Sequence, residues 1–155
     1  MKTEYYVASI VSGYRHLIDE IYENKAPLDP QRMAYHRHEI MRGENREACT
    51  GFYSGNAGHE SLIYYVNNNS HVNHDFLGTV VGLEEDAVKM EVRNTFTVGE
   101  TLEVLTPGME NRCFTVESIT GSKGDAMEKA NHPMEVVTLH IPFSVGMNDI
   151  IRRKR

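Results

Sequence analysis

The sequence Asp75-Phe-Leu-Gly-Thr-Val-Val-Gly-Leu83, followed by Arg93-Asn-Thr-Phe-Thr-Val-Gly-Glu-Thr-Leu-Glu-Val-Leu-Thr-Pro-Gly108, decides the fold of this chain. Between these stretches, apolar and polar residues alternate in Val88-Lys-Met-Glu-Val92. A period of two is typical of half-buried strands. Gly99 supplies a turn between two of them, because glycine adopts a positive φ easily. The pattern predicts strand, turn, strand, tight turn, strand.

More strand-like sequence lies on both sides of this stretch, separated by polar turns and by Pro107-Gly108. Strands that are short and evenly spaced favour a barrel, because closure removes exposed edges. We therefore predict a mainly β, α+β protein built on a small six-stranded β-barrel. Strands are expected at residues 76–83, 87–93, 101–105, 112–119 and 134–140, with a short strand at 62–66 and an edge strand or extended segment at 48–58.

Two helices are expected before the barrel. In residues 3–24, apolar side chains recur at spacings of three and four, and Thr3 can serve as N-cap. Asp29 as N-cap, with Pro30 at the first helical position, predicts a second helix that ends near Met41. The first helix is expected to pack on a core or to form an interface with another domain, through an apolar stripe of Tyr6, Ile10, Tyr14, Leu17, Ile18 and Ile21.

Length and charge limit the organisation and the partners. The chain has 155 residues and predicts one domain, with a helical segment at 1–45, a β-barrel at 46–145 and a basic tail at 146–155. No apolar run is long enough to span a membrane. The net charge of −6 argues against bulk nucleic-acid binding. The ending Arg152-Arg-Lys-Arg155 is interpreted as a solvated tail, or alternatively as a phosphate contact or a junction to another segment.

Cysteine and histidine usage gives little support to a metal site. Cys49 and Cys113 are far apart and are expected to be buried and free, as in a reducing cytosol. His36 and His38 are two residues apart on a helix, so they do not share a face and are expected at the surface. Three other potential metal ligands lie in a predicted loop, which does not hold their side chains in place: His71, His74 and Asp75.

Sequence motifs for catalysis are also missing. There is no G-x-S-x-G elbow, no H-E-x-x-H and no Walker sequence, so no catalytic residue and no cofactor is predicted. Arg93 and Asn94 end an apolar strand and are either a solvated strand end or an anion ligand. Arg15 is either such a ligand or the partner of Asp19 in an i,i+4 ion pair.

Six motifs, in this order, resemble the C-terminal part of the peptidase U-32 family, the collagenase-like proteases. They are Met1-Lys-Thr-Glu-Tyr-Tyr-Val-Ala with Tyr14-Arg-His-Leu-Ile-Asp; Thr50-Gly-Phe-Tyr; Asp75-Phe-Leu-Gly-Thr-Val; Arg93-Asn-Thr-Phe-Thr-Val-Gly-Glu; His132-Pro-Met; and Asp149-Ile-Ile-Arg-Arg. In family members the Met-Lys pair is internal, so the resemblance implies a fragment of a longer protein. The barrel also looks like the second domain of translation elongation factors, a likeness of fold alone.

The resemblance implies a non-catalytic accessory or substrate-recognition domain of a cytoplasmic peptidase or tRNA-modifying enzyme. Relatives are implicated in hydroxylating a wobble uridine of tRNA, with an iron–sulfur cluster and prephenate dependence that belong to a missing N-terminal catalytic domain. The expected partners are that domain and tRNA; the alternative is a protein-interaction module for that domain or a collagen-like substrate. The expected RNA contacts are Arg15, Arg93, Asn94, Arg152 and Arg153, and the expected interface residues are Tyr6 and Tyr14.

Overall fold

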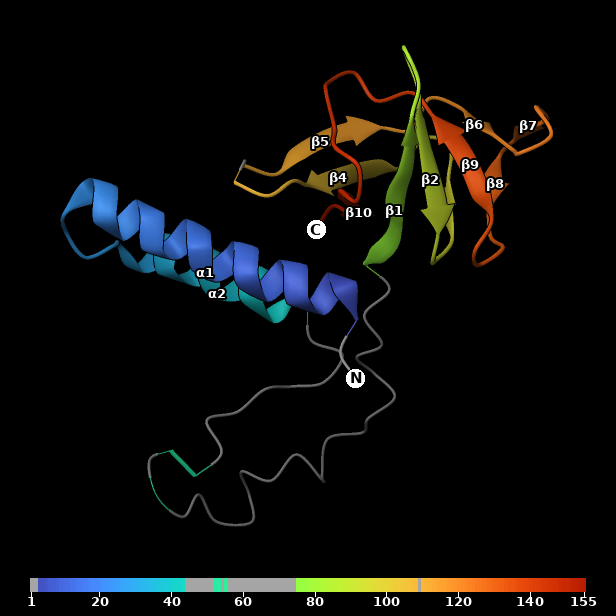
Figure 1. Cartoon of the computed structure of the whole chain (residues 1–155). Coiled ribbons are helices and arrows are strands. Elements are labelled where there is room, and N and C mark those ends of the chain that lie inside the picture. Colours follow the sequence, from blue (N-terminus) through green and yellow to red (C-terminus); the bar gives the residue numbers. More distant parts are fainter. Residues whose placement is uncertain (1–2, 44–51, 54, 56–74, 109) are drawn as a thin grey trace. The chain divides into compact units, whose positions relative to one another are not determined.

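The computed structural model describes residues 3–43, 52–53, 55, 75–108 and 110–155 (Figure 1). The chain divides into two compact units, Met1–Asn73 and His74–Arg155. The described part of the first unit is a pair of helices, and the second unit is made of strands. The strand expected at 62–66 and most of the extended segment expected at 48–58 lie outside the described residues.

The two helices are confirmed, together with both of their N-caps. Helix α1 spans Glu4–Asn24, and Thr3 Oγ1 accepts a hydrogen bond from the backbone N–H of Tyr6 at 3.1 Å. Helix α2 spans Pro30–Met41, and Asp29 Oδ1 accepts from the backbone N–H groups of Gln31 and Arg32. These caps satisfy amide groups that have no partner inside the helix, which is why each helix begins where it does.

The face of α1 that packs against α2 differs from the predicted stripe. Its buried residues are Tyr5, Ser9 and Gly13, and most of them are small. A Cβ atom added at Gly13 would lie 2.6 Å from Ile40 Cγ1, so the absence of a side chain allows close approach of the helices. The apolar side chains of the predicted stripe, expected to pack on a core or to form an interface with another domain, are half-buried or exposed. Hydrophobic periodicity finds an apolar face, but it does not show which neighbour covers it.

The second unit is an antiparallel half-barrel of eight strands with a separate two-stranded ribbon (Figure 1). The eight strands follow one another in the order β5-β4-β10-β1-β2-β9-β6-β7. The ribbon pairs β3 with β8. The strands are β1 Phe76–Leu83, β2 Val88–Val92, β3 Phe96–Thr97, β4 Thr101–Leu105, β5 Arg112–Thr115, β6 Ile119–Thr120, β7 Ala126–Met127, β8 Lys129–Ala130, β9 Val136–Leu139 and β10 Ile150–Arg153.

This topology corrects the predicted strand count. Strands β1 and β4 have the predicted bounds, and β2 and β9 lie inside the predicted ranges. The single strand expected at 112–119 is replaced by β5 and the separate β6. Instead of six strands, the described sheet has eight, and β5 and β7 form its edges. The strands that were not predicted include three of only two residues, which are too short to show a period of two.

The C-terminal segment is the largest correction. The basic tail expected at 146–155 is wrong for Ile150–Arg153, which form β10 in the interior of the sheet. This strand pairs with β1 on one side and with β4 on the other. Consecutive arginines suggested a tail because unpaired charges avoid the interior. The sheet provides an ion-pair partner for the arginine that is buried, so a charged residue can be part of this interior strand.

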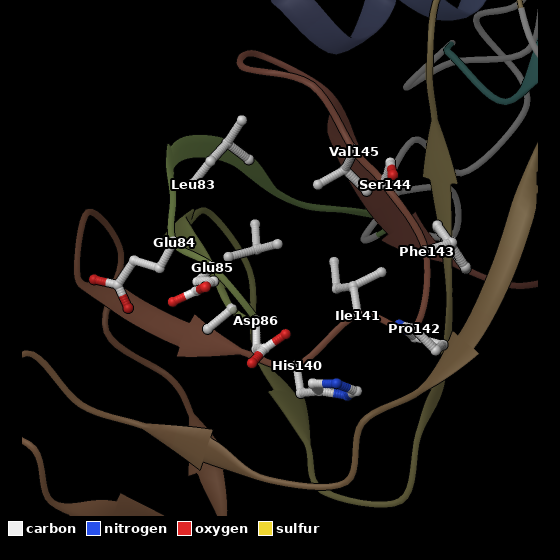
Figure 2. Close-up of a pocket in the computed structure, with 12 residues that line it drawn as sticks. Leu83, Glu84, Glu85, Asp86, His140, Ile141, Pro142, Phe143, Ser144 and Val145 are labelled. Carbon is white, nitrogen blue, oxygen red and sulfur yellow. The ribbon is translucent and has the colours of Figure 1, made fainter.

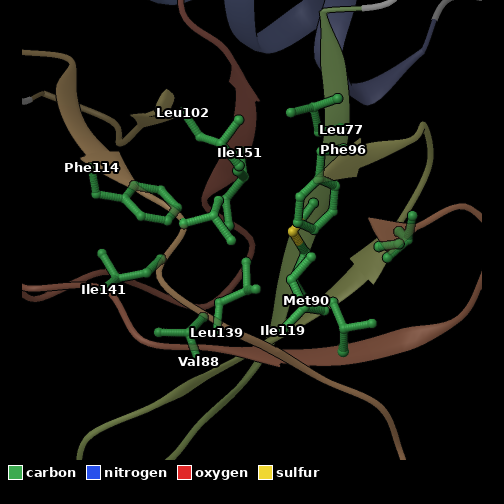
Figure 3. Close-up of a cluster of buried hydrophobic side chains, with 14 of the residues drawn as sticks. Leu77, Val88, Met90, Phe96, Leu102, Phe114, Ile119, Leu139, Ile141 and Ile151 are labelled. Carbon is green, nitrogen blue, oxygen red and sulfur yellow. The ribbon is translucent and has the colours of Figure 1, made fainter. Parts of the chain in front are cut away.

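The core lies on the concave side of the half-barrel and uses the residues of the alternating pattern. Val88, Met90 and Val92 of β2 are buried, as their period of two predicts. Figure 3 shows Met90 and Phe96 packed together, with Leu139 and Ile151 nearby in the same cluster. Gly99 has a φ of 88°, which confirms the turn between β3 and β4.

Cys113 does not have the predicted burial. It lies on β5, an edge strand of the sheet, and its side chain is exposed and free. The neighbour Phe114 points into the core instead, because successive side chains of a strand alternate between faces. Cys49 lies outside the described residues.

Candidate nucleic-acid interface

One end of the sheet gathers most of the predicted RNA contacts. Asn94 Nδ2 donates to the carbonyl oxygen of Phe76 at 2.7 Å, which ties the segment after β2 to the start of β1. Arg153 Nη2 donates to the carbonyl oxygen of Thr95 at 2.9 Å, which ties the end of β10 to the same segment. We call this region the basic end of the sheet: Asp75, Arg93, Asn94, Arg153, Lys154 and Arg155.

Carboxylates accompany the arginines of the basic end. Arg153 Nε lies 3.2 Å from Glu100 Oε2, and Arg155 Nε lies 2.8 Å from Asp75 Oδ1. Arg93 Nη2 lies 2.9 Å from Glu91 Oε1. Asp75 is buried, whereas the pairs of Arg93 and Arg153 are partly exposed on both sides. Exposed pairs stabilise a protein by at most about 1 kcal/mol, so a phosphate can compete with the carboxylates of Glu91 and Glu100. Lys154 is exposed and has no ion pair among the described residues.

Arg93 is held more firmly than an ordinary surface arginine. Its Nη1 donates to Met134 Sδ at 3.0 Å, and its side chain is only about one-third exposed. Its Nε is buried and has no hydrogen-bond partner. Met134 has a positive φ of 69°, an unusual conformation for a residue with a side chain. The guanidinium group is therefore positioned by its neighbours, with one donor group left unused.

Arg152 differs from the other predicted contacts because it is fully buried. Its Nε donates to Glu103 Oε2 at 2.6 Å, and the two residues are directly opposite each other on β10 and β4. Phosphate contact requires an accessible guanidinium group, whereas this geometry is that of a structural ion pair inside the sheet. The burial therefore favours a role for Arg152 in holding β10 in place.

The remaining predicted residues lie on α1 and belong to the other unit. Arg15 Nη2 pairs with Asp19 Oδ1 at 2.7 Å, which is the i,i+4 ion pair considered as the alternative. Tyr14 is exposed, Tyr6 is half-buried, and Tyr5 is buried. The structure thus brings Arg93, Asn94 and Arg153 together at the basic end, and Arg152 is buried in β10. Arg15, Tyr6 and Tyr14 form a separate group on the helix.

The helical hairpin contains an ion cluster that the sequence analysis missed. Glu20 of α1 accepts hydrogen bonds from Arg32 Nε at 2.8 Å and Arg32 Nη2 at 2.5 Å. His36 Nε2 lies 2.7 Å from Glu20 Oε2, and the His36 ring is buried rather than at the surface as predicted. The spacing of Arg32 and His36 was the available signal, because residues four apart share one face of a helix.

These contacts lower the pKa of Glu20 to about 2, chiefly through the hydrogen bond from Arg32 and then through that from His36. Since the folded pKa is depressed, the stabilisation is present above the unfolded value of about 4.5 and is lost as the pH falls toward 2. We expect Glu20→Gln to lower the thermal stability of the hairpin at pH 7, and the difference from wild type to shrink below pH 4.5. Circular dichroism melts between pH 3 and 7 measure this difference.

Glu23→Gln is the matched control for this prediction, because Glu23 is exposed on the same helix and has no ion pair among the described residues. It should leave the melting temperature nearly unchanged at each pH. A constant difference between Glu20→Gln and wild type from pH 7 to pH 3 would show that the charge of Glu20 does not stabilise the hairpin.

A pocket of about 650 Å³ lies at the other end of β1 (Figure 2). Its rim includes the acidic turn Glu84-Glu-Asp86, and its apolar lining includes Val88 and Ile141. Lys89 pairs with Glu84 at 2.6 Å, which leaves the other two carboxylates of the turn without an ion pair within the described part. A phosphate would be repelled by this rim. The charges at the two ends of β1 therefore favour the basic end for contact with nucleic acid.

Neither a candidate metal site nor a membrane-spanning helix is found among the described residues. No group of three or more His, Cys, Asp or Glu side chains among them is placed to hold a metal ion. His71 and His74, considered with Asp75 as ligands on paper, lie outside the described residues. Neither of the described helices is long and apolar enough to cross a membrane.

Comparison with known proteins gives two matches to family models, which are separated by residues 64–71, close to the boundary between the two units. Residues 72–152 match the model described as Peptidase family U32 C-terminal domain. Residues 1–63 match the model described as Peptidase family U32. The first match covers the described strands of the half-barrel, and the second covers both helices.

Characterised relatives match along nearly the whole chain. The tRNA hydroxylation protein P1 of Bacillus subtilis is 28% identical over 99% of this chain and 36% of its own length. The tRNA hydroxylation protein P of Escherichia coli is 29% identical over 95% of this chain and 31% of its own length. The chain therefore spans about a third of the length of these relatives.

A solved structure has the same fold as the sheet. The crystal structure of the C-terminal domain of a Geobacillus thermoleovorans putative U32 peptidase has a TM-score of 0.50 and 24% identity, over 52% of this chain and 93% of that one. At this identity the likeness concerns the fold alone. Because the C-terminal domain model covers more than half of its residues, the chain belongs to peptidase family U32.

Proposed function

We propose that this chain is the accessory, tRNA-contacting part of a tRNA-hydroxylating protein of family U32. The observation that supports this proposal is the similarity to two tRNA hydroxylation proteins, which extends through both the helices and the half-barrel. The catalytic step, and the iron–sulfur cluster implied by the family resemblance, belong in this proposal to an N-terminal catalytic domain. That domain and tRNA are the proposed partners, and the cytoplasm is the proposed compartment.

The geometry favours the basic end of the sheet as the tRNA contact. Arg93, Arg153 and Lys154 lie on adjoining segments there, and each has a side chain that is at least partly exposed. The nearby carboxylates are expected to exclude ligands that cannot displace an ion pair. This agrees with the acidic net charge of the chain, which argues against bulk nucleic-acid binding. Asn94 and Arg152 support the site from within by holding β1 and β10. Arg15 remains a proposed contact on the helical unit.

Removal of two cations tests this proposal. The variant Arg153→Gln/Lys154→Gln is expected to weaken binding of a fluorescein-labelled tRNA transcript. Each phosphate contact that is lost means that fewer counterions are released from the RNA on binding. The slope of log K against log salt concentration should fall by about 1 to 2 in magnitude. Fluorescence anisotropy titrations at three salt concentrations measure this slope.

Lys123→Gln/Lys129→Gln is the matched control, because it removes the same charge from exposed positions outside the basic end. The control should keep the wild-type slope. Equal losses in the two variants would show that binding depends on overall charge rather than on this end of the sheet. The absence of salt-sensitive binding at tens of micromolar wild-type protein would reject the proposed function.

The second candidate function is a protein-interaction module that docks the catalytic domain or a collagen-like protein substrate. The observation that favours it is the exposed apolar side of α1, which includes Tyr14. Tyr6 and Tyr14 are the proposed interface residues. The predicted likeness of the half-barrel to the second domain of translation elongation factors suits either function and stays a prediction.

A further inference from the structure

Helix α1 has an apolar surface that its partner helix does not cover. Five side chains recur at spacings of 4, 3, 4 and 3 residues and are each 41–61% exposed. This spacing keeps them on one face of a helix over most of its length. We call this set the apolar stripe: Val7, Val11, Tyr14, Ile18 and Ile21.

The helical hairpin cannot bury this stripe, because α2 packs on the opposite face of α1. The contact with α2 uses Gly13, against Ile40, and Glu20, which binds Arg32 and His36. At about 100° per residue, the directions of Gly13 and Glu20 are well over 90° from the centre of the apolar stripe. A helix that is apolar on one side and packed on the other is typically covered on both sides.

The chemistry of the apolar stripe favours a protein surface as its partner. The stripe contains no charged residue, so it offers nothing to a phosphate backbone. The charged residues elsewhere on α1 are mainly acidic: Glu4, Asp19, Glu20 and Glu23 outnumber Arg15. An amphipathic helix that lies on an anionic membrane instead has a basic polar face. Apolar burial against protein is the remaining way to remove these side chains from water.

The comparisons indicate which protein surface this is. The segment that carries both helices matches the general family U32 model, whereas the half-barrel matches the separate model for the C-terminal domain. The relatives extend to about three times the length of the matched region. We infer that the apolar stripe docks against the part of the U32 module that lies outside this matched third. This inference rests on the second candidate function and deepens it by naming the docking residues of α1, and it does not depend on tRNA binding at the basic end.

Co-expression of two polypeptides tests the inference. One is the full chain with an affinity tag, and the other is the part of the Bacillus subtilis relative that this chain does not match. The expected result is co-purification of the second polypeptide with the wild-type chain. The matched third of the relative, supplied as a separate polypeptide, is the positive control that shows the larger part is competent to associate.

The variant Val11→Glu/Ile18→Glu places two charges in the apolar stripe and should reduce co-purification at least tenfold. Gln31→Glu/Ala34→Glu adds the same charge at exposed positions of α2 and should leave co-purification unchanged. Equal yields from the stripe variant and the wild type would overturn the inference. So would the absence of association with the wild-type chain when the positive control associates.

Two further readouts separate the inference from its alternatives. In the isolated chain, the stripe variant should unfold at the same temperature as the control variant; a lower temperature would show that the stripe is covered within this chain. A wild-type dimer in sedimentation, converted to a monomer by the stripe variant, would assign the stripe to a second copy and overturn the inference. The stripe variant should also keep wild-type tRNA binding, so failure of docking and failure of the proposed function are distinguishable.

Discussion

Gly78→Ala is expected to destabilise the half-barrel by about 3 kcal/mol or more, near the upper end for added volume in a packed site. A Cβ atom at Gly78 would lie 2.3 Å from the carbonyl oxygen of Glu91 and 2.4 Å from Met90 Cε. The carbonyl belongs to the backbone of β2, which is paired with β1 on one side and with β9 on the other. The Glu91 carbonyl group cannot move without breaking hydrogen bonds between β2 and one of these two strands.

Gly82→Ala in the same strand provides the control. The three atoms nearest to a Cβ atom at Gly82 all belong to the Lys89 side chain, at 3.2 Å and beyond, so a shift of a few tenths of an ångström is enough to make room. The change should alter stability by less than about 1 kcal/mol. Urea unfolding followed by circular dichroism measures both variants, and hydrogen exchange of β1 and β2 localises the loss. Similar free energies of unfolding for the two variants would show that the close approach at Gly78 is not required.

The second large effect is expected at the buried ion pair of β10 and β4. Arg152→Met should destabilise the protein by about 3 kcal/mol, because it leaves the Glu103 carboxylate in the sheet without its guanidinium partner. The double variant Arg152→Met/Glu103→Leu should recover most of this loss, because it removes both charges and keeps apolar volume in place. Urea unfolding of Arg152→Met, Glu103→Leu and the double variant measures the coupling between the residues.

Arg153→Met is the matched control for this cycle. Arg153 and Glu100 form a pair at 3.2 Å whose side chains are each about one-third exposed, so its loss should change stability by less than about 1 kcal/mol. A small effect at Arg152, or a double variant that is no more stable than Arg152→Met, would show that the ion pair does not hold β10 in the sheet.

Local sequence signals predicted the parts of the fold that depend on near neighbours. Thr3 and Asp29 mark the starts of the two helices because the capping bonds are made within three residues. Strands β1 and β4 have the predicted bounds because their turn signals and apolar residues lie within the same short segment. The turn at Gly99 follows from the freedom of glycine to take a positive φ.

The candidate site was predictable only in part. Arg93, Asn94 and Arg153 were identified as polar residues near strand ends, and the structure places them on adjoining segments. The difference between Arg152 and Arg153 was not predictable from composition, because it depends on which side of β10 meets Glu103. His36 was missed for the same reason, since its burial depends on Glu20, sixteen residues earlier in the chain.

The sequence by itself determined the class of the protein, its two capped helices, the alternating core residues of β2 and the family resemblance. Only the tertiary structure decided that the final arginines enter the sheet as β10 and that the apolar stripe of α1 faces away from α2. Each of these outcomes requires a partner that is distant in the chain: β1 and β4 for β10, and α2 for the small-residue face of α1. Local patterns show which residues can be buried, whereas the contacts between distant segments select which of them are.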